Sequence, residues 1–280
     1  MSNQHTVPVV AEHEPGGELP ARMRRFYRDA PAYELQVAAH DEAYFHKYVG
    51  TMLRFLPATL GSVLELGAGN GAALTAFVRE RAPGRVVGLE LSPAGLAAIR
   101  GRGVPHRAVG GDALQLPFAD ASFDMVACFQ VIEHLPSVRT SLDEALRVLR
   151  RPGYLVVGIP NHASLLTPAQ DLLIGRTRFA FGVEGRLGAV RWLTRNAGIV
   201  VRKRLSAGPR YLYREPRLHE GVRGGDSDAV YYACPLDLLR DMKARGALLL
   251  GSDAELRWGR AGRWVPTALR GSAVAVWRVG

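Results

Sequence analysis

The chain has 280 residues, enough for one well-buried core with a large insertion or for two small domains. Its 48% of hydrophobic and 22% of charged residues are ordinary for a soluble globular protein. No apolar run reaches the length of a membrane span, about 18 residues, and the first residues lack the pattern of a signal peptide. Two cysteines exclude a disulfide framework or a zinc cluster, so we expect a protein of the reducing cytoplasm.

The formal net charge is +10, which could indicate a polyanionic partner such as RNA, DNA or an anionic membrane. Lysine occurs only at Lys47, Lys203 and Lys243, so nearly all of the positive charge is arginine, and the arginines are spread along the whole chain. A GC-rich coding bias gives such an even spread without any selection for binding. The sequence therefore favours a compositional origin of the charge over a nucleic-acid partner.

The N-terminal region contains two parts. Residues 1–20 are rich in glycine, proline and glutamate and are predicted to form a flexible tail. Residues 21–57 have mostly helical periodicity, which Pro31 interrupts. We expect one or two helices between 34 and 56, with Pro57 ending them.

From residue 62 onward, strands and helices alternate. Apolar segments predict strands at 62–67, 86–91, 106–112, 123–130 and 154–160, and amphipathic segments predict helices at 71–82, 93–101 and 140–151. Pro93 can occupy the first turn of its helix, and Pro152–Gly153 ends the last one. Apolar strands that alternate with helices imply a parallel sheet covered on both faces, an α/β fold of the Rossmann-like type.

The pattern loosens after residue 160. A helix is predicted at 187–197 with Gly198 as its cap, a sixth strand at 199–205 and a seventh at 272–279. The stretch 206–271 is irregular apart from a helix at about 235–246. This stretch is interpreted as a cap that faces the substrate or, alternatively, as a surface excursion without a binding role. The predicted ligand-binding domain thus comprises 58–205 together with 272–280.

Residues 63–73, VLELGAGNGAA, join the first predicted strand to its helix through a loop with few side chains. A P-loop needs Lys-Ser or Lys-Thr after its last glycine, but here Ala72–Ala73 follow. A dinucleotide-binding loop has the spacing G-x-G-x-x-G, and this loop is one residue short. Glu65 would repel a pyrophosphate, whereas it suits a positively charged ligand. S-adenosylmethionine, which has a sulfonium, an ammonium group and no phosphate, meets these conditions.

The sequence resembles a known family at this loop. ELGAGNG is similar to motif I of the class I S-adenosylmethionine-dependent methyltransferases, and further segments follow in the order of that family: VVGLELS, GDALQLPFADASFDMVAC, FQVIEHL and EALRVLRRPGYLVVGIPN. The resemblance covers about 62–161 closely and is loose beyond, where it is limited to a sixth and a seventh strand. It implies a seven-stranded, mostly parallel, Rossmann-like sheet with helices on both faces.

The resemblance also implies a set of cofactor-binding residues. Glu90, at the end of the second strand, would accept hydrogen bonds from both ribose hydroxyls. Asp112 would face the adenine amino group, and the N–H group of Ala113 would meet a ring nitrogen. Any Cβ at Gly67 or Gly69 would occupy the space of the methionine portion. The full predicted set is Glu65, Gly67, Ala68, Gly69, Gly71, Glu90, Leu91, Asp112, Ala113 and Gln130.

Methyl transfer places few demands on the side chains. The methyl group of a sulfonium is already an electrophile, so the protein has to hold a nucleophile in line behind it. An oxygen acceptor usually also needs a base, and histidine is the usual one. His134, just past the fourth strand, is the candidate catalytic residue, and its alternative role is that of a helix cap or packing residue.

The segment QVIEH also resembles a sub-pattern of ubiquinone-pathway O-methyltransferases and small-RNA 2′-O-methyltransferases, in which Glu-x-x-Glu-His binds a divalent metal. This chain has Gln130 in place of the first Glu and keeps Glu133 and His134. Because an amide is a weaker ligand than a carboxylate for a hard cation, we predict no metal. Gln130 is expected beside the methionine part of the cofactor instead.

The acceptor pocket is expected between the N-terminal helices and 161–271. Tyr33 and Tyr44 rank first, because leading helices in this family often close over the cofactor. The full set of candidates is Tyr27, Tyr33, His40, Tyr44, Tyr211, Tyr213, Tyr231 and Tyr232.

The sequence thus predicts an enzyme that moves a methyl group from S-adenosylmethionine to a small-molecule acceptor, an oxygen of a sugar, glycoconjugate or secondary metabolite. The charge suggests a nucleic-acid methyltransferase as the alternative, although no Asn-Pro-Pro-Tyr-type element for base amino-methylation follows the fourth strand. A non-catalytic cofactor-binding protein is the third hypothesis. The acceptor atom, the substrate and the oligomeric state do not follow from the sequence.

Overall fold

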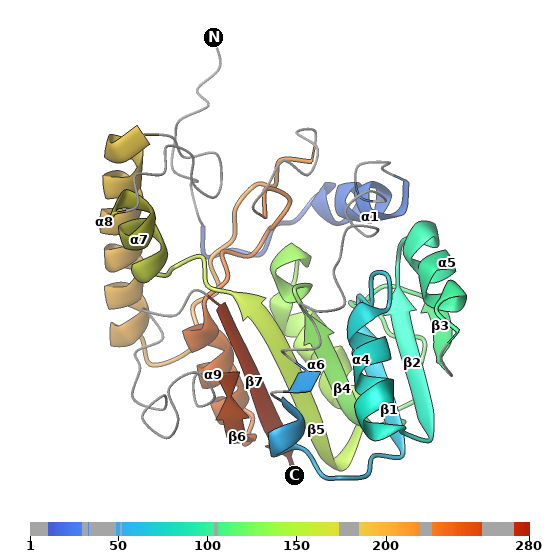
Figure 1. Cartoon of the computed structure of the whole chain (residues 1–280). Coiled ribbons are helices and arrows are strands. Elements are labelled where there is room, and N and C mark those ends of the chain that lie inside the picture. The colour runs from blue at the N-terminus through green and yellow to red at the C-terminus, as the bar shows by residue number, and fades with distance from the viewer. Residues whose placement is uncertain are drawn as a thin grey trace.

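A computed structural model describes residues 11–29, 33, 49–50, 52–103, 106–173, 185–218, 226–253 and 272–280. In this part of the chain, seven strands form one sheet in the order β3-β2-β1-β4-β5-β7-β6 (Figure 1). The strands are β1 Ser62–Leu66, β2 Arg85–Glu90, β3 Arg107–Gly110, β4 Phe123–Phe129, β5 Leu149–Pro160, β6 Leu248–Ser252 and β7 Ser272–Val279. β7 runs antiparallel to both of its neighbours, β5 and β6, and the other described strand pairs are parallel. The predicted fold class, a seven-stranded and mostly parallel Rossmann-like sheet, is confirmed.

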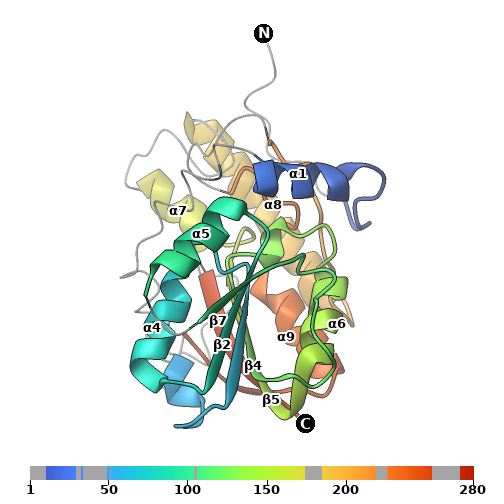
Figure 2. The ribbon, with the colours of Figure 1, turned by 90° about the vertical axis from the view of Figure 1, so that its right-hand side faces the viewer.

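Helices cover both faces of the sheet. α4 (Ala72–Arg81) and α5 (Pro93–Gly101) lie on one face, and α6 (Val138–Val148) and α9 (Pro235–Ala244) lie on the other (Figure 2). α1 (Leu19–Asp29) lies across the carboxyl-terminal edge of the sheet, where the strand arrows point in Figure 1. The remaining helices are α7 (Leu166–Leu173), α8 (Gly185–Leu205) and the short 3-10 helices η1 (Leu53–Phe55) and η2 (Ile132–His134).

The strand β1 is buried along its whole length, which explains its apolar sequence. Leu64 and Leu66 belong to the core on the α6 side, while Val63 belongs to the opposite core with Phe77 of α4. This alternation places Glu65 on the α4 side of the same strand. A carboxylate in a fully buried strand contributes nothing to apolar packing, so its presence indicates a ligand site.

Two predicted helices begin and end for visible reasons. At α5, Ser92 caps the first turn by accepting a hydrogen bond from the N–H group of Gly95, and Pro93 occupies the first turn as predicted. The helix predicted at 140–151 ends earlier, at Val148. Leu149 instead pairs with Phe123 of β4, so residues 149–151 belong to β5 and their prediction as helix is wrong.

The prediction of a strand at 199–205 is also wrong. α8 continues through Gly198 to Leu205 as one helix of 21 residues, so Gly198 does not cap it. The apolar run at its end resembles a strand in sequence, but Ile199 and Val200 pack in the core while Val201 is exposed, a helical rather than an alternating pattern.

The sixth strand is β6, which lies inside the stretch 206–271. It is an edge strand that pairs only with β7 among the described strands, and Leu248 and Leu249 in it are exposed. Its sequence, LLLGS, has no alternation that would identify it as a strand. β6 and α9 therefore extend the sheet domain, and the division of the remaining chain into domain and cap stays a prediction.

The N-terminal region differs in part from the sequence-based expectation. Ala11 pairs with Tyr213 through two backbone hydrogen bonds, and α1 already begins at Leu19, so residues 11–20 are not the free tail that we predicted. The helices predicted between 34 and 56 lie mostly outside the described residues. Their described end is helical at 49–50 and 52, and η1 follows before Pro57.

None of the helices in the described residues combines the length and apolar character needed to cross a lipid bilayer. The predicted cytoplasmic location stays a prediction.

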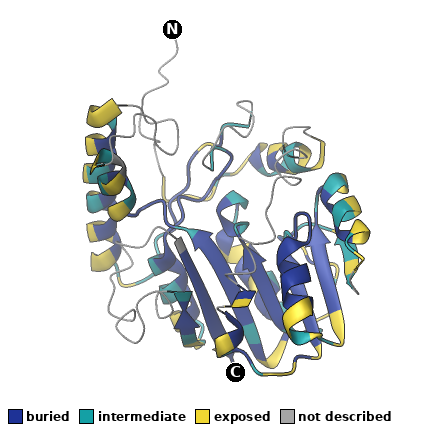
Figure 3. Ribbon diagram, viewed as in Figure 1, coloured by how far each residue is buried: buried dark blue, intermediate teal, exposed yellow. Residues whose placement is uncertain are grey.

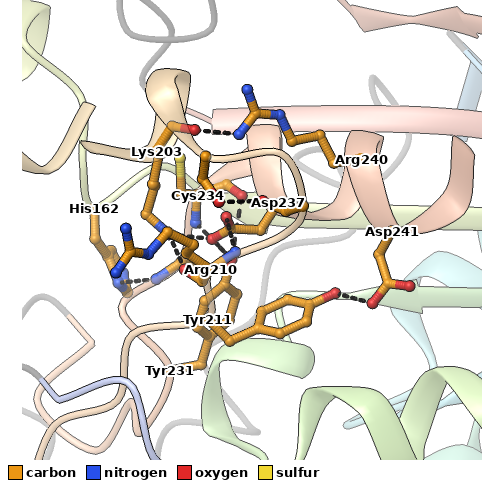
Figure 4. A network of polar contacts seen from close by, with 12 residues as sticks. His162, Lys203, Arg210, Tyr211, Tyr231, Cys234, Asp237, Arg240 and Asp241 are labelled. Atoms are coloured by element: carbon orange, nitrogen blue, oxygen red, sulfur yellow. Dashed lines mark hydrogen bonds and ion pairs between the residues drawn. The ribbon is translucent and has the colours of Figure 1, made fainter. Parts of the chain in front are cut away.

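A buried ion pair fastens α8 to α9. The side chains of Lys203 and Asp237 are 1% and 0% exposed, and the ammonium group of Lys203 donates a hydrogen bond to the Asp237 carboxylate (Figure 4). The same carboxylate accepts hydrogen bonds from the Tyr231 hydroxyl at 2.9 Å and the Arg210 N–H group at 3.1 Å. Such a pair stabilises the fold only while both charges remain, because a lone buried charge has no solvent to stabilise it.

We predict that Lys203→Met lowers the free energy of unfolding by about 3–5 kcal/mol, since it leaves the Asp237 carboxylate buried and unpaired. Adding Asp237→Asn should restore most of this loss, because it removes the buried charge and its amide oxygen can still accept the bond from the Arg210 N–H group. Urea denaturation monitored by circular dichroism measures the change, with Lys243→Met on the exposed end of α9 as the control, expected within about 0.5 kcal/mol of the wild type. Equal loss in the single and double variants would contradict this account.

Candidate active site

A cavity of about 560 Å³ lies at the carboxyl-terminal ends of β1, β2 and β4. Its lining comes mainly from the loops after β1, β2, β3 and β4, from α1 and from Asp226 and Asp228. The strand order reverses between β1 and β4, and in open α/β sheets a ligand binds at this point. The cavity is therefore the candidate active site.

The glycine loop has a backbone that needs glycine for two different reasons. The φ angles of Gly67, Gly69 and Gly71 are 61°, 53° and 76°, in the left-handed region that side chains disfavour. A Cβ on Gly67 would also lie 2.5 Å from a methyl group of Val131. Gly67, Ala68 and Gly69 line the cavity as predicted, whereas Gly71 does not and instead caps the start of α4.

Glu65 presents a buried carboxylate to the cavity. One of its oxygens, Oε2, has no hydrogen-bond partner in the described part of the chain. Burial raises the pKa of Glu65 well above its usual range, and the Leu74 N–H group offsets this only in part. A cationic ligand group would supply the missing partner, so the site fits the ammonium group of the expected cofactor.

Glu90 connects the glycine loop to the end of β2. Its Oε2 accepts a hydrogen bond from the Gly69 N–H group at 2.8 Å, and its Oε1 accepts from the N–H groups of Leu91 and Ser92 at 2.8 Å each. A carboxylate has about four acceptor positions, so roughly one remains. The carboxylate can accept one ribose hydroxyl directly, and a second would have to share a position with a backbone N–H group.

Asp112 lies between the cavity and α1. Its Oδ1 accepts a hydrogen bond from the Leu114 N–H group at 2.9 Å, and its Oδ2 lies 3.3 Å from the guanidinium of Arg24. Ala113 beside it is buried and lines the cavity, as does Leu91. The structure thus brings together the residues that the resemblance assigns to the adenosine half of the cofactor.

Gln130 occupies a strained position at the end of β4. Its φ angle is 54°, which is rare for a residue with a side chain, and its N–H group donates to the Gly158 carbonyl at 2.8 Å. It lines the cavity. With Gln130, all of the predicted cofactor residues except Gly71 line one cavity.

His134 and Asp228 form a charged pair on the other side of the cavity. The Nδ1 atom of His134 lies 3.3 Å from the Oδ2 atom of Asp228, and the Tyr27 hydroxyl donates to the same oxygen at 2.9 Å. Burial alone would lower the pKa of His134, but the charges of Asp228, Glu133 and Asp226 raise it above its ordinary value. A histidine thus lines the cavity between two acids, with Asp228 near its Nδ1 atom and Glu133 3.8 Å from its Nε2 atom.

Sequence reasoning missed Asp228 and Asp226, which also lines the cavity. Asp226 lies 2.8 Å from the Nε2 atom of His162, a contact that holds the pKa of Asp226 well below its usual range despite its burial. Both acids stand in the segment RGGDSDAVYYA, whose glycines and acids gave only a loop signal. No local pattern could show that this loop reaches a cavity built mainly by residues 65–135.

Glu133 is buried, and neither of its carboxylate oxygens is hydrogen-bonded within the described residues, although its Oε1 atom lies 3.8 Å from the Nε2 atom of His134. Burial raises its pKa to about 8, and the nearby His134 opposes that rise. In the described residues, no group of three or more His, Cys, Asp or Glu side chains could hold a metal ion. The predicted lack of a metal stays a prediction.

The acceptor candidates separate into three groups. Tyr27 and Tyr33 line the cavity. Tyr211, Tyr213, Tyr231 and Tyr232 are buried and do not line it. His40 and Tyr44 lie outside the described residues.

The cavity is strongly acidic. Its described lining includes five carboxylates and neither lysine nor arginine; the carboxylates are Glu65, Glu90, Asp112, Asp226 and Asp228. A phosphate-bearing ligand would meet repulsion on both sides of such a cavity, whereas a sulfonium and an ammonium group would be stabilised.

Comparison with known proteins gives the class of the domain. Residues 64–157 match the model of a family described as a methyltransferase domain. A protein of Mycolicibacterium smegmatis, named probable S-adenosylmethionine-dependent methyltransferase, is 35% identical over 136 residues, which are 48% of this chain and 51% of that protein. A phthiotriol/phenolphthiotriol dimycocerosates methyltransferase of Mycobacterium tuberculosis is 35% identical over 138 residues, 46% of this chain and 49% of that protein.

Solved structures with a similar overall fold are also known. A solved structure of 1,6-didemethyltoxoflavin-N1-methyltransferase from Burkholderia thailandensis superposes with a TM-score of 0.54 at 16% identity, and covers 96% of this chain and 94% of that one. The chain spans about half the length of the curated relatives it matches. It carries a methyltransferase domain with S-adenosylmethionine as the methyl donor, which confirms the resemblance and the cofactor predicted from the sequence.

We predict that Glu65→Gln weakens binding of adenosylhomocysteine by about 10-fold to 100-fold, because it removes one charge-assisted hydrogen bond of about 1.5–3 kcal/mol. Binding of adenosine, which lacks the ammonium group, should not change. In the wild type, affinity for adenosylhomocysteine should rise with pH through the raised pKa of Glu65, because the cation binds the ionised form. Isothermal titration calorimetry measures both ligands, and this pH dependence should disappear in the variant.

The contrasting variant is Glu90→Gln. Its amide group cannot accept all three backbone N–H groups, so the glycine loop loosens and the affinities for adenosine and adenosylhomocysteine fall together. Glu18→Gln, at an exposed position before α1, is the control that should change neither. A Glu65→Gln variant that loses both ligands equally would contradict the assignment of its carboxylate to the ammonium group.

Proposed function

We propose that this protein transfers a methyl group from S-adenosylmethionine to a hydroxyl oxygen of a small-molecule acceptor. One observation carries the proposal: a single cavity joins the glycine loop, Glu90 and Asp112 to the cluster of His134, Asp228 and Tyr27. The first set suits the donor. The second contains a candidate base. An oxygen acceptor usually needs a base to remove its proton, whereas a neutral amine needs less help.

In this proposal, His134, Asp228 and Tyr27 have different roles. S-adenosylmethionine supplies an electrophilic methyl group when bound. His134 lies between two acids, with its Nδ1 atom 3.3 Å from Asp228 and its Nε2 atom 3.8 Å from Glu133, and it is assigned as the base that accepts the proton of the acceptor hydroxyl. Burial and the Asp228 charge raise the pKa of Tyr27, so its hydroxyl stays protonated and keeps donating to Asp228.

A small acceptor fits the surroundings of the cavity. α1 lies across this edge of the sheet in both ribbon views (Figures 1 and 2), and Tyr27 and Tyr33 add aromatic surface to the lining. The carboxylates of Asp226 and Asp228 disfavour a polyanionic acceptor such as RNA or DNA. One relative has phthiotriol and phenolphthiotriol in its name, which supports an alcohol or phenol oxygen as the acceptor.

We further propose that the acceptor-facing cap is limited to residues 206–234. Asp226 and Asp228 line the cavity, and the N–H groups of Val230 and Tyr231 both donate to the Glu133 carbonyl, at 2.7 Å and 2.8 Å. The rest of the stretch 206–271 that is described belongs to α9 and β6 of the sheet domain.

The experiment is incubation of the full chain with methyl-labelled S-adenosylmethionine and either a low-mass metabolite extract or total nucleic acid. Label should appear in low-mass products whose methyl group survives mild acid and is attached to oxygen. Label only in nucleic acid would favour the alternative acceptor class. Tight cofactor binding without turnover on either would favour a non-catalytic role.

We predict that His134→Ala lowers kcat by about 10²-fold to 10⁴-fold, while the exposed His13→Ala has no effect. The rate should rise with pH as the His134 ring loses its proton, at a pH above the ordinary histidine pKa because the Asp228 charge stabilises the protonated ring. Asp228→Asn removes that charge, so the rise should move to lower pH. A pH–rate profile for kcat/KM measures this, and an unmoved profile would show that His134 is not the base.

A further inference from the structure

The helix α8 has two apolar faces on opposite sides. One face packs into the core through Ala189, Trp192, Ile199 and Val200. The other contains two exposed apolar pairs, Leu187 with Val190 and Val201 with Leu205, which project from the same side of the helix, with exposed Thr194 and Gly198 between the pairs. We call these four residues the outer stripe. Only the first face is explained by the fold.

The outer stripe is exposed. The exposed fractions are 78% for Leu187, 47% for Val190, 55% for Val201 and 83% for Leu205. Figure 3 shows the exposed positions along the length of α8, at the side of the molecule away from β3. Single exposed apolar residues are ordinary, but two such pairs on one side of the same helix indicate a docking surface.

Arginines flank the outer stripe on both sides. Helical geometry places Arg191 and Arg202 along one flank and Arg186 and Arg204 along the other, and all four are exposed. α8 contains neither aspartate nor glutamate. An apolar stripe between two basic flanks is the pattern of a helix that lies in the plane of an anionic bilayer surface.

We propose that the outer stripe of α8 docks this protein side-on to an anionic lipid bilayer. The apolar side chains enter the boundary between headgroups and acyl chains, and the flanking arginines contact lipid phosphates. A second copy of the chain fits the face less well, because pairing two identical stripes brings the arginine flanks of one copy against those of the other. The proposal is independent of the methyl-transfer reaction, since the outer stripe lies outside the lining of the cavity.

The buried face of α8 holds the helix in a fixed position. Lys203 pairs with Asp237, and the Asn196 amide donates to the carbonyls of His162 and Ser164 at 2.9 Å and 2.8 Å. The helix is thus fixed to the sheet domain and to the segment after β5. A rigidly held stripe needs no folding on binding, so it loses little conformational entropy at the membrane.

The test is flotation of the full chain with vesicles of phosphatidylcholine alone or of an equal mixture with phosphatidylglycerol. The wild type should float with the mixed vesicles, more weakly as salt increases. Leu187→Gln with Leu205→Gln should lower the partition coefficient by about tenfold or more. Arg191→Gln with Arg202→Gln should lower it by roughly tenfold to thirtyfold for mixed vesicles and should weaken its dependence on salt.

Matched controls make the result specific. Leu248→Gln with Leu249→Gln removes exposed leucines from β6, and Arg100→Gln with Arg107→Gln removes exposed arginines from α5 and β3; neither pair should change flotation. All variants should keep the wild-type thermal midpoint and adenosylhomocysteine affinity. Absence of flotation at low salt, or equal flotation of the stripe and control variants, would overturn the proposal. So would a dimer in light scattering that the leucine variant abolishes while no variant binds vesicles.

Discussion

The negative charge of the cavity is the constraint on which the site depends. Glu65 and Glu90 are almost completely buried, and burial raises the pKa of both. Water cannot stabilise their charges, so the protein does so by two different means. Glu90 accepts hydrogen bonds from three backbone N–H groups, one of them in the glycine loop, and thereby fixes that loop. Glu65 keeps one oxygen without a partner in the described residues, where a cationic group of a ligand would fit.

The second half of the site depends on contacts between distant parts of the chain. The carbonyl of Glu133 in η2 accepts two N–H groups from residues 230–231, and this brings Asp228 to His134. Tyr27 of α1 then binds the same carboxylate. Three segments separated by about a hundred residues each thus meet at one oxygen, which no local motif encodes. The cluster of His134, Asp228 and Tyr27 therefore exists only in the folded protein.

The outer stripe of α8 adds a feature unrelated to the cavity. The net charge of +10 comes from arginines spread along the chain, a pattern that indicates a compositional origin. On α8 the same arginines acquire a spatial arrangement, because the helix sorts them to the flanks of an apolar face. A compositional origin of the charge does not prevent a binding role for these arginines. An arginine-rich chain has positive charge on most of its surfaces, and only some of these surfaces also have exposed apolar residues.

The sequence by itself determined the sheet from β1 to β5 and the glycine loop, because strands buried on both faces and tight turns leave strong local signals. Almost all of the predicted cofactor residues line the cavity for this reason. Beyond residue 160 the local signals conflict: the run after Gly198 is apolar in any conformation, and the edge strand β6 has no alternation. Tertiary packing determined whether these segments form helix or strand. Residues 199–205 are helical because α8 packs on the core, and residues 248–252 form a strand because they pair with β7. It also decided the partners of His134, because contacts between remote segments depend on topology and not on spacing.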